Sequence, residues 1–85
     1  MIRRDVTVID TAGVHARTAQ ELVVLAKSFA SSIYLRRGGS TATLRNPISI
    51  LALGLACGAT VEVLADGADE QAALAAIEAH LSSVH

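Results

Sequence analysis

The chain has 85 residues, which suffices for one hydrophobic core and predicts a single domain over residues 1–85. Its formal net charge is -1 and its only aromatic residues are Phe29 and Tyr34, which argues against binding to nucleic acid. No apolar stretch is long enough to span a bilayer and no secretory signal is recognisable, so we expect a cytoplasmic protein without membrane insertion. Cys57 is the single cysteine; it excludes an internal disulfide, and we expect it to be a small buried residue.

The first two elements that the residue pattern predicts are a strand and a helix. Residues 2–9 alternate between apolar and polar side chains, as in a half-buried strand. After a turn over residues 10–13, apolar residues recur at helical spacing, which predicts a helix from Ala16 to near Lys27 or Ser28. This helix is expected to pack on the apolar face of the strand.

A histidine stands at the predicted start of this helix. His15 directly precedes the helix, with Gly13 behind it and Arg17 ahead of it. The first N–H groups of a helix have no internal acceptor and the helix dipole is positive there, so the N–H groups of Ala16, Arg17 and Thr18 predict an anion site. The Arg17 guanidinium suits phosphate oxygens, and the positive surroundings favour the neutral, nucleophilic imidazole. The alternative is that His15 is an ordinary turn residue.

The middle of the chain predicts a hairpin. Residues 33–37 alternate, Gly38-Gly39 is a strong tight-turn signal, and residues 40–44 follow as the second strand. Arg36 and Arg37 beside this turn are expected to be solubilising charges.

A short helix is predicted to follow the hairpin and to stop at Gly54. Asn46 is a preferred N-cap residue, and Pro47 suits the first helical position because its missing N–H has no partner there. Apolar residues lie on nearly every side of this helix. They must therefore either be buried against more than one neighbouring element or remain exposed for a partner. Ile50 and Leu53 suit the core, whereas the remaining apolar residues suit a partner better. Those residues are Pro47, Ile48 and Leu51.

The last part of the chain predicts another strand and another helix. Alternation resumes after Gly58, Asp66-Gly67 is a turn, and Asp69 and Glu70 place acid in the first turn of the helix. The apolar stripe of this helix is Leu74, Ile77, Leu81 and Val84. The two histidines here, His80 and His85, are expected to be solvated.

The resulting order βαββαβα predicts an α+β open-faced β-sandwich, in which a four-stranded antiparallel sheet carries three helices on one face. The other face should be polar. Its expected occupants are Arg3, Asp5, Thr7, Tyr34, Arg36, Thr41 and Glu62.

The whole chain resembles the HPr family, the histidine-containing phosphocarrier proteins of the bacterial phosphoenolpyruvate-dependent sugar phosphotransferase system. The resemblance lies in Gly13-Val14-His15-Ala16-Arg17, in the stretch from Leu44 to Leu55, and in the length and element order. It implies that enzyme I phosphorylates His15 on Nδ1, and that His15 passes the phosphoryl group to sugar-specific enzyme IIA components. Arg17 matches the active-site arginine of the family.

The resemblance also implies a docking surface for both partners, formed by Pro47, Ile48, Leu51 and Ala52. We therefore expect a monomeric carrier that is not itself an enzyme and needs no metal or cofactor. Within the family, a regulatory carrier of the nitrogen branch or of a dihydroxyacetone kinase system is the alternative. A metal-binding or RNA-binding sandwich is disfavoured, because the chain lacks a cluster of metal ligands and sheet aromatics.

Two positions depart from the family pattern. Thr18 replaces the usual proline, which restores a backbone N–H, adds a hydroxyl and removes a rigid first turn, so we expect it to tune the site without abolishing it. Asn46 occupies the place of a regulatory serine found in many members. Because Asn46 has no hydroxyl, we expect no phosphorylation there by the ATP-dependent kinase; stoichiometric labelling of nearby Ser49 would contradict this.

Overall fold

The computed structural model describes residues 1–83 and contains the predicted elements in the predicted order. They are β1 (Ile2–Thr7), α1 (Ala16–Ala26), β2 (Ser32–Arg37), β3 (Ser40–Thr43), α2 (Pro47–Leu51), β4 (Thr60–Asp66) and α3 (Glu70–Leu81). The strands form one antiparallel sheet in the order β1-β4-β2-β3. The expectations for Val84 and His85 lie outside the described residues.

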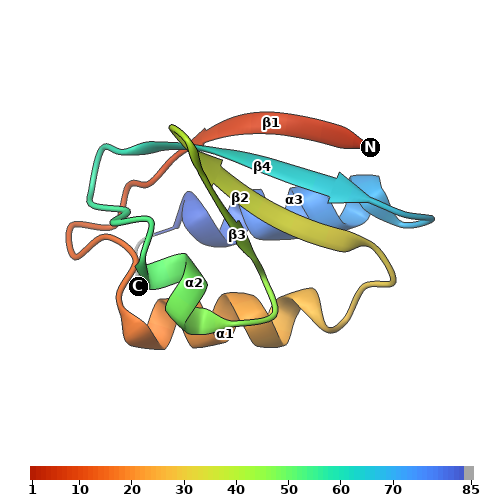
Figure 1. The fold of residues 1–85 in the computed structure, drawn as a ribbon, viewed down its shortest axis with the longest axis horizontal. Helices are drawn as coiled ribbons and strands as arrows, with labels where there is room; N and C mark the ends of the chain where they lie inside the picture. The colour runs from red at the N-terminus through yellow and green to blue at the C-terminus, as the bar shows by residue number, and fades with distance from the viewer. Residues whose placement is uncertain (84–85) are drawn as a thin grey trace.

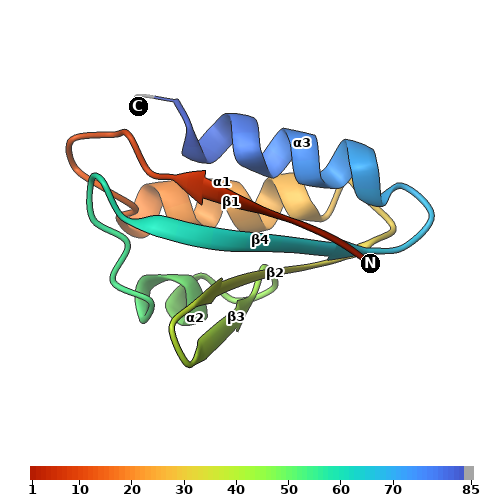
Figure 2. The same cartoon turned by 90° about the horizontal axis from the view of Figure 1, so that it is seen from above.

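The molecule has two layers, a sheet and the helices that cover one of its faces (Figures 1 and 2). The strand register aligns the apolar residues of neighbouring strands: Val6 lies opposite Val61, and Val63 lies opposite Leu35. Together with Leu22 of α1 and Ile77 of α3, these side chains are almost completely buried. The period-2 and period-3.6 patterns therefore meet in one aliphatic core, as predicted.

The other face of the sheet is polar, also as predicted. Glu62 lies opposite both Asp5 and Arg36 in the register, and the Nε of Arg36 donates a hydrogen bond of 2.7 Å to its carboxylate. Arg3 lies 3.7 Å from the other oxygen of Glu62. The exception is Leu64, which shares this face and is nevertheless buried.

The segment after α2 differs from the prediction in two respects. The helix ends at Leu51, and Leu53 and Gly54 continue only as turns, with Gly54 at φ 64°. Cys57 is exposed, and its thiol lies 3.7 Å from the carbonyl oxygen of Ile9, so the prediction that it is buried was wrong. The connection runs along the surface here, and Leu53 and Leu55 supply its buried side chains instead.

The start of α3 also differs from the simple expectation for an acidic first turn. Asp69 is the N-cap residue, but its carboxylate makes no hydrogen bond to the helix. It accepts hydrogen bonds from the N–H groups of Ala30 and Ser31, each of 2.9 Å, and one from the hydroxyl of Ser31. The Ser31 hydroxyl, followed by the N–H of Ala30, lowers the pKa of Asp69 below its ordinary value.

Candidate functional site

The loop before α1 is shaped by Asp10 and Gly13. Asp10 is buried; its carboxylate accepts a hydrogen bond of 2.9 Å from the N–H of Ala12, and its carbonyl accepts one of the same length from Gly13. Gly13 has φ 68°, and a Cβ at this position would lie 2.5 Å from the carbonyl oxygen of Leu55. Only glycine fits this close approach. The turn was predicted, but the role of the buried carboxylate was not.

This loop is joined to the segment that follows α2. The N–H of Val14 donates a hydrogen bond of 2.7 Å to the carbonyl of Leu55. The guanidinium of Arg37 donates to the carbonyls of Leu53 and Gly54, at 3.1 and 2.7 Å. Arg37 was expected to be only a solubilising charge. That prediction was incomplete, because its hydrogen bonds also hold the segment that directly follows α2 in place.

His15 is the N-cap residue of α1, with extended backbone angles and no hydrogen bond between its side chain and a backbone N–H group of the helix. The first helical bond runs from the N–H of Ala19 to the carbonyl of His15 at 2.9 Å. Among residues 1–83, the N–H groups of Ala16 and Arg17 have no hydrogen bond to a protein acceptor, and both residues are exposed. The helix start is therefore open, with an imidazole beside it.

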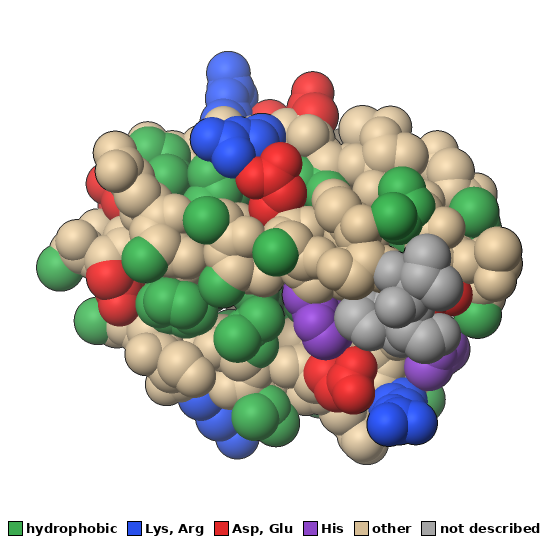
Figure 3. All heavy atoms as spheres, turned by 180° about the vertical axis from the view of Figure 1, so that it is seen from behind, with side chains coloured by type: hydrophobic (Ala, Val, Ile, Leu, Met, Phe, Trp, Pro, Cys, Tyr) green, Lys and Arg blue, Asp and Glu red, His purple; other side chains and the backbone are tan. Residues whose placement is uncertain are grey.

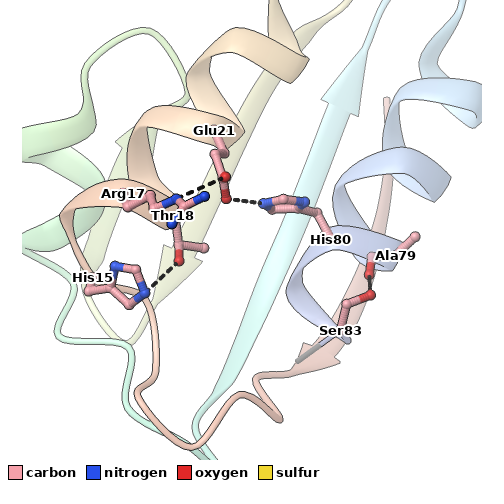
Figure 4. A network of polar contacts seen from close by, with 7 residues as sticks. All are labelled: His15, Arg17, Thr18, Glu21, Ala79, His80 and Ser83. Atoms are coloured by element: carbon pink, nitrogen blue, oxygen red, sulfur yellow. Dashed lines mark hydrogen bonds and ion pairs between the residues drawn. The ribbon is translucent and has the colours of Figure 1, made fainter. Parts of the chain in front are cut away.

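The ring of His15 is held by the third residue of the helix. The hydroxyl oxygen of Thr18 lies 3.2 Å from Nε2 of His15, and Figure 4 shows the two side chains turned toward one another. Thr18 is only 2% exposed, so little space is left for its side chain to move away. The N-cap and N3 positions face one another at the start of a helix, which places these two side chains within reach of each other.

The guanidinium of Arg17 is turned away from the imidazole. It is 84% exposed and its Nε lies 3.6 Å from a carboxylate oxygen of Glu21 one turn along the helix (Figure 4). The other oxygen of Glu21 lies 3.3 Å from Nε2 of His80, so the expectation that His80 is simply solvated was wrong. Seen from the side opposite to the view of Figure 1, histidine, acidic and basic side chains share one part of the surface (Figure 3). An exposed pair of this kind is worth only about 0.3–0.5 kcal/mol, so Arg17 can readily turn to another anion.

The apolar residues predicted to dock a partner lie on α2, which packs against α1. Ile48 is 71% exposed and Leu51 is 37% exposed, whereas Ile50 is completely buried. Pro47 is half-buried and Ala52 is exposed. Figure 1 shows α2 beside the first turns of α1. The exposed side chains of α2 and the imidazole therefore belong to one end of the molecule.

Residues 1–83 contain neither a cluster of metal ligands nor a membrane-spanning helix. No group of three or more His, Cys, Asp or Glu side chains is placed to hold a metal ion there. None of the helices in this range combines the length and the apolar character needed to cross a membrane.

A family model, related sequences and a solved structure all show that the chain is similar to HPr proteins. The family described as the PTS HPr component phosphorylation site matches residues 2–83. A phosphocarrier protein HPr from Cupriavidus necator is 34% identical over 83 residues, covering 98% of this chain and 93% of its own. One from Treponema pallidum is 38% identical over 78 residues, covering 92% of this chain and 89% of its own. The crystal structure of a phosphocarrier protein HPr from Bacillus anthracis strain Ames superposes with a TM-score of 0.90 at 26% identity, covering 95% of this chain and 96% of its own.

Proposed function

The chain belongs to the HPr family of phosphocarrier proteins, and on that premise we propose that His15 accepts a phosphoryl group from enzyme I and passes it to enzyme IIA-type proteins. The observation that carries the proposal is the position of His15 at the open start of α1. A nucleophilic ring there stands beside unpaired N–H groups and the positive end of the helix dipole, which suit the oxygens of a phosphoryl group.

In the proposed reaction His15 attacks phosphorus in line with the bond to the donor's histidine. The phosphorus–nitrogen bond to His15 forms as the bond to the donor ring breaks, and the electron pair of the breaking bond returns to the donor. The charge on the equatorial oxygens is stabilised by the N–H groups of Ala16 and Arg17, with that of Thr18 behind them, and by the Arg17 guanidinium. When Arg17 turns from Glu21 to the phosphoryl group, only the weak, exposed ion pair with Glu21 is lost.

The partner surface of this proposal comprises Pro47, Ile48, Leu51 and Ala52. An apolar side chain as exposed as that of Ile48 gains free energy when a partner covers it. The protein would act in the cytoplasm as a protein substrate of its partners rather than as an enzyme. Asn46 accepts a hydrogen bond of 2.9 Å from the N–H of Ile48 as the cap of α2, and we propose that no kinase phosphorylates this position.

The proposal is tested by incubating the chain with radiolabelled phosphoenolpyruvate and enzyme I. We expect an acid-labile phosphoryl adduct that the His15→Ala variant does not form. His80→Ala is the matched control, because it removes the other described histidine and should leave the adduct in place. An adduct that persists in His15→Ala, or disappears in His80→Ala, would contradict the assignment.

A further inference from the structure

Thr18 makes a contact that an anion site does not require. Its hydroxyl oxygen lies 3.2 Å from Nε2 of His15, the ring nitrogen other than Nδ1. Thr18 is buried, and the branched side chain of threonine has few χ1 rotamers in a helix. The hydroxyl is therefore a fixed partner of the ring, and one that a proline at this position could not provide.

The direction of this hydrogen bond decides which nitrogen can react. If the hydroxyl donated, the ring proton would have to be on Nδ1, and that nitrogen would have no lone pair with which to attack phosphorus. If Nε2–H donates, the lone pair is on Nδ1. Nδ1 of an N-cap histidine is as many bonds from the backbone as the oxygen with which Asn or Asp caps a helix. The positive end of α1 favours a lone pair at that position over an N–H group.

We propose that Thr18 is a positioning residue, whose Oγ1 accepts a hydrogen bond from Nε2–H of His15 and so keeps the Nδ1 lone pair available for phosphorus. This inference rests on the proposed function. In the transfer step the proton stays on Nε2 while Nδ1 gains phosphorus, so the ring becomes positively charged. A hydrogen bond from a charged donor is stronger than one from a neutral donor, so the contact stabilises the phosphorylated ring more than the free one.

The first test places the proton without any phosphoryl transfer. In the protein labelled with ¹⁵N-histidine, at a pH where the His15 ring is neutral, we expect NMR to find the proton on Nε2 and to detect it in slowed exchange with water. Thr18→Ser keeps the hydroxyl and should keep this signal, whereas Thr18→Val keeps the shape and should lose it. A ring proton on Nδ1 in the unmodified chain would overturn the proposal, and so would an Nε2–H signal that is unchanged in Thr18→Val.

The second test measures the rate at which enzyme I phosphorylates each variant. Loss of one hydrogen bond that strengthens with charge should slow Thr18→Val by about fivefold to tenfold, and Thr18→Ser should restore most of the rate. Thr41→Val, which removes an exposed hydroxyl from the far face of the sheet, should leave the rate unchanged. Equal rates for Thr18→Val and the unmodified chain would overturn the proposal. If the unmodified chain is not phosphorylated at all, the proposed function fails, and the NMR measurement still decides the hydrogen bond.

Discussion

Gly13 shows how strictly one residue can be required at this site. Its φ of 68° lies in the left-handed region, and the space that a Cβ would need is taken by the carbonyl oxygen of Leu55 at 2.5 Å and the Cα of Ala56 at 2.9 Å. The two constraints are independent, because the first belongs to the loop itself and the second to a segment far along the chain.

The variant Gly13→Ala should therefore lower the free energy of unfolding by at least about 2 kcal/mol, measured by urea denaturation. The left-handed conformation alone costs about 1–2 kcal/mol for a residue with a Cβ, and the contact with Leu55 adds to it. Gly38→Ala is the matched control, since Gly38 has φ 59° with no atom within 4 Å of the added Cβ. Equal losses in the two variants would show that the approach to Leu55 contributes nothing.

At the scale of elements, α2 divides its apolar residues between two roles. Ile50 is completely buried, while Ile48 is 71% exposed although it lies only half a turn away. A substitution at Ile48 can therefore change the surface without opening the core.

We expect Ile48→Asp to slow phosphorylation by enzyme I at least tenfold at low carrier concentration, because a charged side chain would have to be desolvated where the partner docks. The free energy of unfolding should change by less than about 0.5 kcal/mol, as for most exposed positions. Thr41→Asp places the same charge on the open face of the sheet and should leave the rate unchanged. An equal effect of both variants would point to net charge instead of docking.

Asp69 connects two elements that are distant in sequence, since its carboxylate binds the N–H groups of Ala30 and Ser31 from the N-cap of α3. These hydrogen bonds lower the pKa of Asp69, so the folded state favours the ionised form. The stabilisation is complete above the ordinary pKa of an aspartate, about 3.9, and is lost as the pH falls through the lowered pKa of the folded state.

The difference in urea midpoint between the unmodified chain and Asp69→Asn should consequently be constant from pH 7 to about pH 5 and shrink below about pH 4. Asp5→Asn, which alters an exposed carboxylate on the sheet, should change the midpoint little across this range. A difference for Asp69→Asn that does not depend on pH would rule out the ionised carboxylate as its source.

The element types could be predicted from the sequence because alternation and helical spacing are local signals. Asn46 was assigned correctly for the same reason, since a cap acts on residues two or three positions ahead. The contacts of Arg37 and Asp69 were not predicted. The carbonyl that accepts from Arg37 and the N–H groups that donate to Asp69 belong to segments distant in sequence, which only the folded chain brings close. Arg17 could be placed on the right helix turn, but its pairing with Glu21 depends on which of several rotamers the side chain adopts.

At the scale of the whole molecule, the sheet has two edges that a second copy could extend. One edge is β1, which carries three consecutive charged residues, and the other is β3, which has only four residues. Charged side chains and short strands both discourage pairing between sheet edges. Both edges thus favour a single chain.

We therefore expect sedimentation equilibrium to give the mass of one chain at low and at high salt. High salt screens the charges of β1, so it is the more demanding condition. A mass of two chains at either salt concentration would contradict the prediction of a monomer.

The hydrogen bond between Val14 and Leu55 also indicates at which stage of folding the site is formed. It closes a long loop of chain, and such contacts form late because their entropic cost must be met before they stabilise anything. A peptide copy of residues 10–20 would contain His15, Arg17 and Thr18, yet an isolated helix of that length is barely populated in water. It would also lack α2. If His15 accepts a phosphoryl group as proposed, the chain acquires this property only when its fold is complete, and unfolded molecules take no part in the transfer.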